Sequence, residues 1–387
     1  MKKIWLLFIL SLLVLPTKLC AAEVVNGDAR PDVYLPLLEG KRVAVFSNHT
    51  GMVGDRHLVD VLKAEGVTVT VILSPEHGFR GHADAGEIVS STVDKATGIP
   101  VCSLYGKQKV NVDSVLRQVD VLVTDIQDVG LRFYTYYITM YHLMDACAVT
   151  GTPMVLLDRP NPNGFYVDGP LLDMRHKSGV GALPIPVVHG MTLGELARMI
   201  NGEEWLKNGA QCKLTVVPCL NYTHQTRTLV TVPPSPNLRT MKAIYLYPSI
   251  CYFEGTVVSL GRGTDKPFLL YGHPGMKGYT FSFTPQSMPG AKNPPLLGQR
   301  CFGRDLSQIP DIHIQRQGLD LSYVIDAYRR TGLGDKFFTS FFENLIGVDY
   351  VRQMIKDGRS AKAIKQCWKA DVRQFKQQRK PYLLYAE

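Results

Sequence analysis

The chain has 387 residues, a formal net charge of +9 and a charged fraction of 20%. Its hydrophobic fraction of 45% is ordinary for a globular protein and excludes a largely disordered chain. The mild positive charge suits an anionic partner. The sequence shows no basic stripe with interleaved aromatic residues, which argues against nucleic acid as that partner. The length favours two domains over a single core.

The first 22 residues are typical of a secretory signal. Lysines precede an apolar run over residues 4–15, Pro16 ends the run, and the small residues at 20–22 favour cleavage before Glu23. The run is shorter than the roughly 20 residues that a membrane-spanning helix needs. We therefore expect an exported protein, periplasmic or secreted, with no stable membrane insertion after cleavage. A lipoprotein anchored through Cys20 is the less favoured alternative.

The sequence has eight cysteines, of which Cys20 belongs to this predicted signal. The others are irregularly spaced and form no CxxC pair, so they fit neither a disulfide framework nor a zinc site. Most lie within apolar runs, where buried free thiols are expected.

The first part of the chain alternates short apolar strands with helical segments. Strands are expected at 42–46, 67–73, 119–124, 154–157 and 214–217, and helices at 56–65, 133–149 and 192–201. This alternation predicts an α/β fold, a Rossmann-like parallel sheet covered by helices on both faces. No GxGxxG or P-loop motif is present, so a nucleotide site does not follow. Ligands of such sheets bind at the carboxyl ends of the strands.

A proline cluster at 233–236 marks a change of pattern and predicts a domain boundary. We expect a signal peptide at 1–22, a Rossmann-like catalytic domain at 23–235 and a smaller α+β C-terminal auxiliary domain at 236–387. Within the second domain the spacing predicts a helix over about 319–330 and a charged helical tail over about 350–378, whose lysines and arginines form a solvated face.

Polar residues cluster directly after the predicted strands. Residues 74–82 hold Glu76, His77 and Arg80 on a loop shaped by glycine and proline, for which a solvated polar loop is the alternative. Residues 124–132 follow the next strand and hold Asp125, Asp128 and Arg132. Asp128 fits a helix cap equally well. Arg132 would oppose the dipole at a helix start, which suggests a nearby carboxylate or ligand.

Other strand ends and the second domain supply further candidates. Asn48, Asp158, Arg159, Asn161 and His189 also follow predicted strands, and Glu254, Arg262 and Thr264 lie in the second domain. Thr192 and Glu195 form a capping box, so we interpret them as structural. Glu254 follows an apolar stretch, where a carboxylate needs a partner or a functional role. The planar guanidinium of Arg262 suits a carboxylate ligand. A salt bridge between Glu254 and Arg262 is the alternative.

These loops favour carboxylate chemistry on a polar substrate, with glycoside hydrolysis as the leading candidate. A metal-dependent hydrolase using Glu76, His77, His82 and Asp84, which Asp125 and Asp128 could join, is one rival, although the spacing fits no familiar metal pattern. A non-catalytic protein that binds cell-wall fragments is the other.

Several strings in order resemble the NamZ-type exo-β-N-acetylmuramidases, long catalogued as a conserved domain of unknown function. The resemblance rests on SNHTG (47–51), SPEHGFRG (74–81), SLYG (103–106), DIQDVGLRFYTY (125–136), LDRPNPNG (157–164), HGMTLGELA (189–197), PPSPN (233–237), YPSICYFEGT (247–256) and GRGTDKPF (261–268). It implies an active site between the two domains and removal of N-acetylmuramic acid (MurNAc) from the non-reducing end of peptide-free glycan fragments, without metal or organic cofactor. The family's candidate catalytic glutamate falls on Glu76.

The residues and the resemblance together give a hypothesis for the site. Glu76 acts as general acid beside His77, and Asp125 or Glu254 stabilises the sugar cation. Arg262 or Arg132 pairs with the lactyl carboxylate of MurNAc. The residues expected to bind the peptidoglycan-derived saccharide are Asn48, Arg80, Asp128, Arg132, Asp158, Arg159, Asn161, His189, Arg262 and Thr264.

Overall fold

The computed structural model describes residues 23–75, 78–79, 92–104, 110–276 and 278–387. Within these residues the largest element is a seven-stranded sheet in the order β11-β8-β7-β1-β4-β6-β5. β5 pairs antiparallel to β6, and the other neighbours pair in parallel. The strands are β1 (Arg42–Ser47), β4 (Thr68–Ser74), β5 (Thr92–Val93), β6 (Pro100–Ser103), β7 (Val121–Asp125), β8 (Met154–Leu157) and β11 (Leu214–Val217).

The strand order is doubly wound. From β1 the chain builds β4 and β6 on one side, then returns to build β7, β8 and β11 on the other. The carboxyl ends of β1 and β7 therefore flank the switch point, where such sheets bind ligands. The predicted strands are confirmed to within a residue or two, because near-continuous apolar runs are what strands buried on both faces require.

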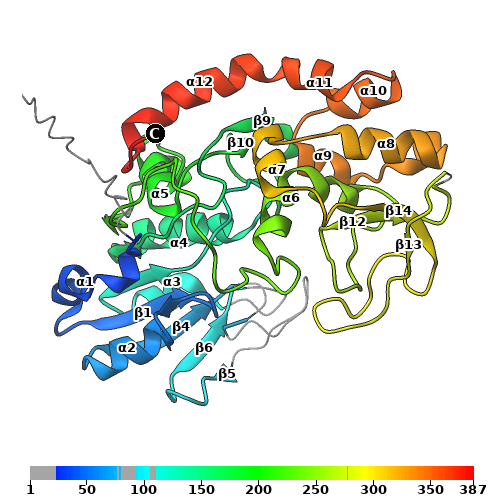
Figure 1. Ribbon diagram of the computed structural model, residues 1–387. Helices are drawn as coiled ribbons and strands as arrows, with labels where there is room; N and C mark the ends of the chain where they lie inside the picture. The colour runs from blue at the N-terminus through cyan, green and yellow to red at the C-terminus, as the bar shows by residue number, and fades with distance from the viewer. Residues whose placement is uncertain (1–22, 76–77, 80–91, 105–109, 277) are drawn as a thin grey trace, which may run out of the picture.

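Helices cover both faces of the sheet (Figure 1). Alternate residues of β1 belong to two separate hydrophobic cores. Val43 and Val45 pack with residues of α1 and α2, whereas Ala44 and Phe46 belong to a larger core that includes residues of α3, α4, α5 and the second part of the chain. These helices are α1 (Pro31–Leu38), α2 (Leu58–Ala64), α3 (Val112–Leu116), α4 (Tyr136–Thr150) and α5 (Leu193–Gly202).

The second part is α+β, as predicted. A three-stranded antiparallel sheet in the order β12-β14-β13 lies beside a group of helices (Figure 1). Its strands are β12 (Leu270–His273), β13 (Ser282–Phe283) and β14 (Cys301–Asp305). Its helices are α6 (Met241–Ile250), α7 (Asp311–Gln317), α8 (Ser322–Thr331), α9 (Phe341–Ile346), α10 (Tyr350–Lys356), α11 (Ala361–Cys367) and α12 (Lys369–Arg379). Small two-stranded pairs complete the described strands: β2 (Met52–Val53) with β3 (Arg56–His57), and β9 (Asp168–Leu171) with β10 (Pro186–Val188).

The charged tail differs from the expectation in two ways. It forms three short helices instead of one, and it is not simply solvated, because Trp368 and Arg379 are buried. The chain end then returns to the first domain, where α12 ends close to α5 (Figure 1). There the backbone N–H of Leu384 donates to Glu195 Oε1 at 2.8 Å and the N–H of His224 donates to Ala386 O at 2.8 Å.

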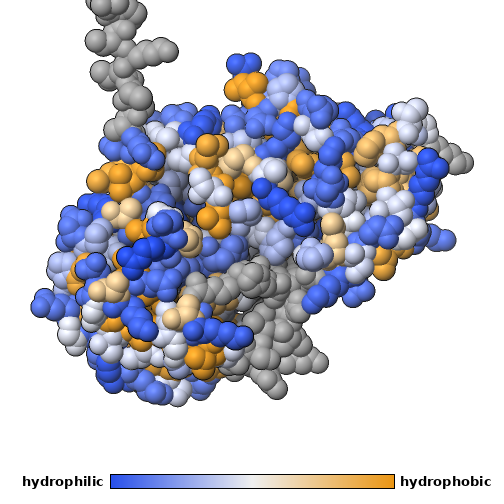
Figure 2. All heavy atoms as spheres, turned by 60° about the horizontal axis from the view of Figure 1, so that its bottom comes forward, coloured by the Kyte–Doolittle hydropathy of each residue, from blue (hydrophilic) through white to orange (hydrophobic). Residues whose placement is uncertain are grey.

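The surface shown in Figure 2 is mostly polar, with hydrophobic residues scattered in small groups. All seven cysteines after residue 22 are free thiols, and Cys147, Cys212, Cys219, Cys251 and Cys301 are buried, as the sequence predicts. Among the described residues no helix is both long enough and apolar enough to cross a membrane.

Candidate active site

The loop after β4 carries Glu76, His77 and Arg80, which lie outside the described residues. The backbone that flanks the first two is well anchored. Pro75 is buried, its carbonyl accepts a hydrogen bond from Gly78 N at 3.2 Å, and the Phe79 ring packs edge-on against His57 with centroids 4.7 Å apart. The roles assigned to Glu76, His77 and Arg80 remain predictions.

Arg159, after β8, joins two carboxylates. Its Nε and Nη2 donate to Asp125 at 2.6 and 3.0 Å, and Nη2 also donates to Asp28 at 2.5 Å. Burial and the neighbouring Asp125 carboxylate raise the pKa of Asp28 to about 7. Asp125 is fully buried, with both oxygens held by Arg159. It therefore has a structural role, and the hypothesis that it faces the sugar cation is not supported.

The structure corrects the role predicted for Arg132. The side chain is fully buried and donates to the carbonyl oxygens of Pro170, Ile185, Leu345 and Ile346 at 2.7 to 3.0 Å. Two of these carbonyls end α9, where a positive charge is favourable. Gly347 is required beside it, because a Cβ there would lie 2.5 Å from Arg132 Nη2. The prediction that Arg132 binds the substrate carboxylate is wrong.

Asp158 is also a structural residue. Thr192 Oγ1 and the Tyr385 hydroxyl donate to its Oδ2 at 2.6 and 2.7 Å, and the N–H of Gly194 donates to Oδ1 at 2.9 Å. The side chain is fully buried, so the prediction that it contacts substrate is wrong. The capping box of Thr192 and Glu195 at the start of α5 is confirmed.

Asn161 and His189 hold the neighbouring loops together. Asn161 Nδ2 donates to Met191 O at 2.8 Å and Oδ1 accepts from Asn163 N at 2.8 Å. His189 is fully buried and its Nδ1 accepts from Met191 N at 3.2 Å. Burial, with the positive charge of Arg379, lowers the pKa of His189 to about 3, so the ring is neutral. Neither side chain is placed to meet a substrate, which corrects both predictions.

Asn48, at the end of β1, positions an aromatic residue. It is fully buried, its Oδ1 accepts from Thr50 N and Oγ1 at 2.9 and 2.6 Å, and its Nδ2 donates to the Tyr136 hydroxyl at 2.9 Å. Tyr136 in turn donates to Pro234 O at 3.0 Å. The side chain is therefore occupied by Thr50 and Tyr136, which does not support the predicted contact between Asn48 and substrate.

A pocket of about 140 Å³ brings Glu254 and Arg262 together with residues that precede and begin α4. Arg262 Nε and Nη2 both donate to Glu254 Oε1, at 3.0 and 2.6 Å. The salt bridge left open by the sequence therefore exists, but both side chains remain partly exposed, at 20% for Arg262 and 26% for Glu254. We call this cavity the Glu254 pocket. Its lining is completed by Phe133, Tyr134, Thr135, Tyr136, Val180, Ser235, Asn237, Leu238, Tyr247 and Phe268.

Thr264 shapes the loop that presents Arg262. Its hydroxyl donates to Gly261 O at 2.7 Å and accepts from Lys266 N at 3.1 Å, which closes the turn. The predicted contact between Thr264 and substrate stays a prediction. Gly261 and Gly263 on either side of Arg262 have φ of 87° and 78°, a conformation that favours glycine.

The sequence reasoning missed the tyrosines and the asparagine of this pocket. Tyr134 and Tyr136 lie within DIQDVGLRFYTY and Asn237 within PPSPN, but the sequence pattern assigns both tyrosines to the apolar helix predicted over 133–149. The alternation of Tyr134 and Tyr136 just before a helix was the available signal. Both hydroxyls donate hydrogen bonds to Pro234 O, at 2.7 and 3.0 Å, and both side chains line the Glu254 pocket.

Comparison with known proteins decides the family. Family models described as the N-terminal and C-terminal parts of exo-beta-N-acetylmuramidase NamZ match residues 43–242 and 245–385. The chain belongs to the NamZ family. The recognition made from the sequence is therefore confirmed. The two NamZ models meet a few residues beyond the predicted boundary at 235/236, whose position stays a prediction, because one hydrophobic core spans both parts.

Individual proteins also match this chain over most of its length. It is 38% identical over 375 residues to peptidoglycan beta-N-acetylmuramidase NamZ of Bacillus subtilis strain 168, covering 92% of this chain and 89% of the relative. Two crystal structures of DUF1343 family proteins from Bacteroides fragilis are similar. One has 57% identity and a TM-score of 0.89 over 95% of this chain and all of that one. The other has 26% identity and a TM-score of 0.77, covering 94% and 99%.

No metal centre emerges from the described part of this NamZ family member, which holds no group of three or more His, Cys, Asp or Glu able to bind one. The rival metal hypothesis rests on Glu76, His77, His82 and Asp84, and all four lie outside the described residues.

Asp128 is a buried carboxyl group at the switch point, and the N-cap residue of α4 is Thr135. Its Oδ1 accepts from Gly130 N at 2.7 Å, and Oδ2 has no hydrogen-bond partner within the described residues. Burial raises its pKa to about 7, far above the usual value of an aspartate. The folded protein therefore holds a proton on Asp128 that the unfolded chain releases near pH 4.

This raised pKa predicts a pH-dependent loss of stability. The native state binds more protons than the unfolded state between about pH 4 and 7, so stability falls as pH rises through that window. Replacing Asp128 with Asn keeps the acceptor for Gly130 and removes the titration. We expect the drop in unfolding free energy from pH 5 to pH 8 to shrink by on the order of 2 kcal/mol. Urea titrations of both proteins at the two pH values measure it, and equal drops would contradict the prediction.

Proposed function

We propose that this protein is an exo-acting glycoside hydrolase that releases MurNAc from the non-reducing end of peptidoglycan fragments such as MurNAc-GlcNAc. Membership of the NamZ family supports the activity, as does the name of the Bacillus subtilis relative. The observation in this chain that carries the proposal is the Glu254–Arg262 pair, a carboxylate and a guanidinium held in one aromatic-walled pocket.

Glu76 is proposed as the general acid. Hydrolysis of a glycosidic bond needs one carboxyl group to protonate the leaving oxygen and a second group to stabilise or attack the sugar cation. The proposal is supported by the sequence position of Glu76, two residues after the end of β4, because β4 is the neighbour of β1 in the sheet and β1 ends at the switch point. His77 is the adjacent candidate to orient it.

Glu254 is the better candidate for the second carboxylate. Unlike Asp125, it is partly exposed and lines a cavity. Both hydrogen bonds from Arg262 go to Oε1, which leaves Oε2 with no partner among the residues described here. A carboxylate held on one oxygen by arginine is oriented, with the other oxygen available to a developing positive charge or a water.

Arg262 is proposed to recognise the lactyl carboxylate that distinguishes MurNAc from GlcNAc. Its Nε and Nη2 are used by Glu254, and its Nη1 donates no hydrogen bond within the described ranges. The guanidinium carbon lies 5.1 Å from the centroid of the Phe268 ring, which restricts its movement. A fixed guanidinium with a free edge suits a substrate carboxylate.

Replacing Arg262 with Met tests this role. We expect kcat/KM on a MurNAc substrate to fall by about 10²-fold, because a charge-assisted contact is lost and Glu254 loses its partner. The preference for a MurNAc over a GlcNAc para-nitrophenyl glycoside should fall with it. Arg316→Met, at an exposed arginine of α7, is the matched control and should leave both values unchanged. Unchanged sugar preference in folded Arg262→Met would refute the assignment.

Mass spectrometry of the purified protein incubated with MurNAc-GlcNAc tests the activity itself. We expect both free monosaccharides to appear from the disaccharide, and a longer alternating strand to lose one MurNAc from its non-reducing end. Tight binding with no release would favour a non-catalytic binding protein. An export route through the predicted signal at 1–22, to the periplasm or the medium, is part of the proposal and is checked by N-terminal sequencing of the mature protein.

A further inference from the structure

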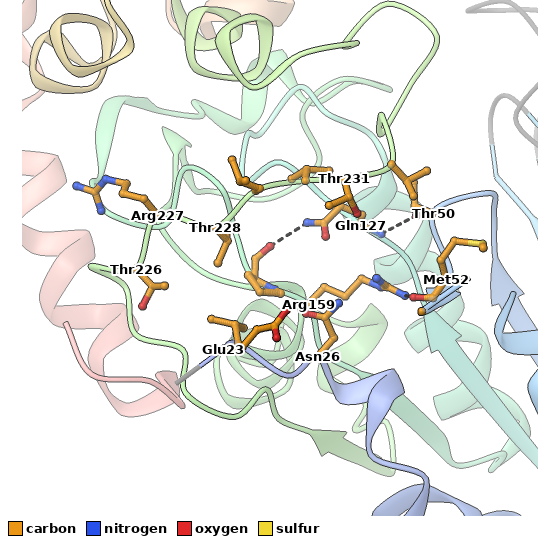
Figure 3. Close-up of a pocket in the computed structure, with 16 residues that line it drawn as sticks. Glu23, Asn26, Thr50, Met52, Gln127, Arg159, Thr226, Arg227, Thr228 and Thr231 are labelled. Carbon is orange, nitrogen blue, oxygen red and sulfur yellow. Dashed lines mark hydrogen bonds between the residues drawn. The ribbon is translucent and has the colours of Figure 1, made fainter. Parts of the chain in front are cut away.

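A second cavity, of about 530 Å³, lies at the carboxyl ends of β1, β7 and β8 (Figure 3). We call it the threonine pocket, because threonines occur on several sides of it. It shares no lining residue with the Glu254 pocket. Its lining consists of Glu23, Val24, Asn26, Thr50, Met52, Gly54, Gln127, Arg159, Pro160 and residues 226–232.

One segment of chain separates the two pockets. Residues 226–232 line the threonine pocket and Ser235, Asn237 and Leu238 line the Glu254 pocket. Between them, Pro234 O accepts from Tyr134 and Tyr136, and His49 Nε2 lies 2.8 Å from Pro233 O. The segment is therefore pinned at its middle, and the threonine pocket is a site of its own.

Three polar atoms around the threonine pocket are unpaired. Arg159 is 8% exposed and its Nη1 donates to none of the described residues. Gln127 is 7% exposed, its Nε2 donates to Asp128 O and Pro160 O, and its Oε1 accepts nothing from them. The hydroxyl of Thr228 is buried without a partner in the same described part of the chain. A buried hydroxyl left unpaired, like that of Thr228, is unfavourable. With the donor Arg159 Nη1 and the acceptor Gln127 Oε1 beside it, it points to a polar occupant.

The charges around the cavity select against an acidic occupant. Arg159 lines the cavity but is already neutralised by Asp125 and Asp28. Arg227 is engaged elsewhere, with its guanidinium carbon 3.8 Å from the Phe165 ring centroid and a hydrogen bond to Gln225 O. The occupant is therefore neutral, with hydroxyls for the threonines.

The unpaired atoms also match one functional group. An acetamido group offers one carbonyl acceptor and one N–H donor, which complement the donor Arg159 Nη1 and the acceptor Gln127 Oε1. Val24, Met52 and Pro160 supply apolar surface for its methyl group and for a pyranose face. In Figure 3, Thr228 and Thr231 extend from the dividing segment over Gln127 and Arg159. The volume is far larger than a single water requires.

We infer that the threonine pocket is a second saccharide site, which binds a neutral N-acetylhexosamine such as the GlcNAc unit of a glycan strand. MurNAc carries the same acetamido group, but Arg159 is already paired with Asp125 and Asp28 and offers no net positive charge to its lactyl carboxylate. MurNAc therefore binds here more weakly. The inference goes beyond the hydrolysis proposed above, since it concerns a ligand with no MurNAc and a different cavity.

Titration with N,N′-diacetylchitobiose, followed by saturation-transfer NMR and calorimetry, tests this site. We expect saturable binding to the wild type, weaker binding of MurNAc, and none of cellobiose, which lacks acetamido groups. The double variant Thr228→Val/Thr231→Val removes two hydroxyls with little change of shape and should weaken binding at least about fivefold. Thr231→Trp should fill the cavity and weaken it further. Thr215→Val, at an exposed threonine of β11, is the matched control and should bind as the wild type does.

Three outcomes overturn the inference: no chitobiose binding by the wild type, binding unaffected by both threonine variants, or MurNAc binding as tightly as chitobiose. Binding that survives the threonine variants and disappears in Arg262→Met belongs to the Glu254 pocket and also overturns it. Because chitobiose contains no MurNAc, a protein that fails to hydrolyse MurNAc-GlcNAc can still pass this test, and the two proposals fail separately.

Discussion

Replacing Glu76 with Gln is expected to slow release of MurNAc from MurNAc-GlcNAc by about 10³-fold, because a positioned general acid contributes on the order of 10² to 10⁴ to the rate. Glutamine is close in shape but cannot donate the proton that the leaving sugar oxygen needs. Steady-state rates measured by chromatography of the released sugars give the value. Glu65→Gln, at an exposed glutamate that ends α2 just before β4, is the control and should be fully active.

The leaving group distinguishes the role of Glu76. A dinitrophenyl MurNAc glycoside needs little protonation to depart, so Glu76→Gln should slow its cleavage far less than that of the disaccharide. An equal loss on both substrates would make Glu76 a nucleophile or a binding residue. Near-normal turnover of the disaccharide by folded Glu76→Gln would end the assignment altogether.

Arg132→Met is expected to lower the free energy of unfolding by about 4 kcal/mol, because it leaves several buried carbonyl oxygens without donors. Arg132 donates to four carbonyls, two of them at the end of α9 in the second part of the chain. Urea denaturation followed by circular dichroism measures the change. Arg329→Met removes an exposed arginine with one hydrogen bond to Gly358 O and should change stability by less than about 1 kcal/mol.

A loss for Arg132→Met no larger than that of Arg329→Met would contradict the structural role of Arg132. A stable variant with specifically impaired MurNAc binding would restore the interpretation made from the sequence. The two measurements together therefore separate a residue that holds the fold from one that meets the ligand.

The sheet was predictable because its signals are local. The residues of β1, β7 and β8 form apolar runs, and the capping box of α5 lies within four consecutive residues. These local patterns did not predict the order of the strands in the sheet. The two-domain α/β class nevertheless followed from the alternation of strands and helices and from the change of pattern at the prolines.

The roles of individual polar residues were less predictable because their partners are distant in the sequence. Arg132 meets carbonyls 213 and 214 residues away, and Asp158 meets Tyr385 at a separation of 227. A polar side chain at a strand end can face a ligand or can tie loops together, and both uses leave the same local pattern. Glu254 and Arg262 are close in sequence, which is why their pairing could be anticipated.

The contact between the last residues and the first domain bears on how the protein can be divided. The last residues hydrogen-bond to the first domain: Tyr385 donates to Asp158, Leu384 donates to Glu195, and Ala386 accepts from His224. A fragment ending near residue 240 would therefore leave the buried carboxyl groups of Asp158 and Glu195 without these donors. Expression of either half by itself is therefore a poor route to a folded sample.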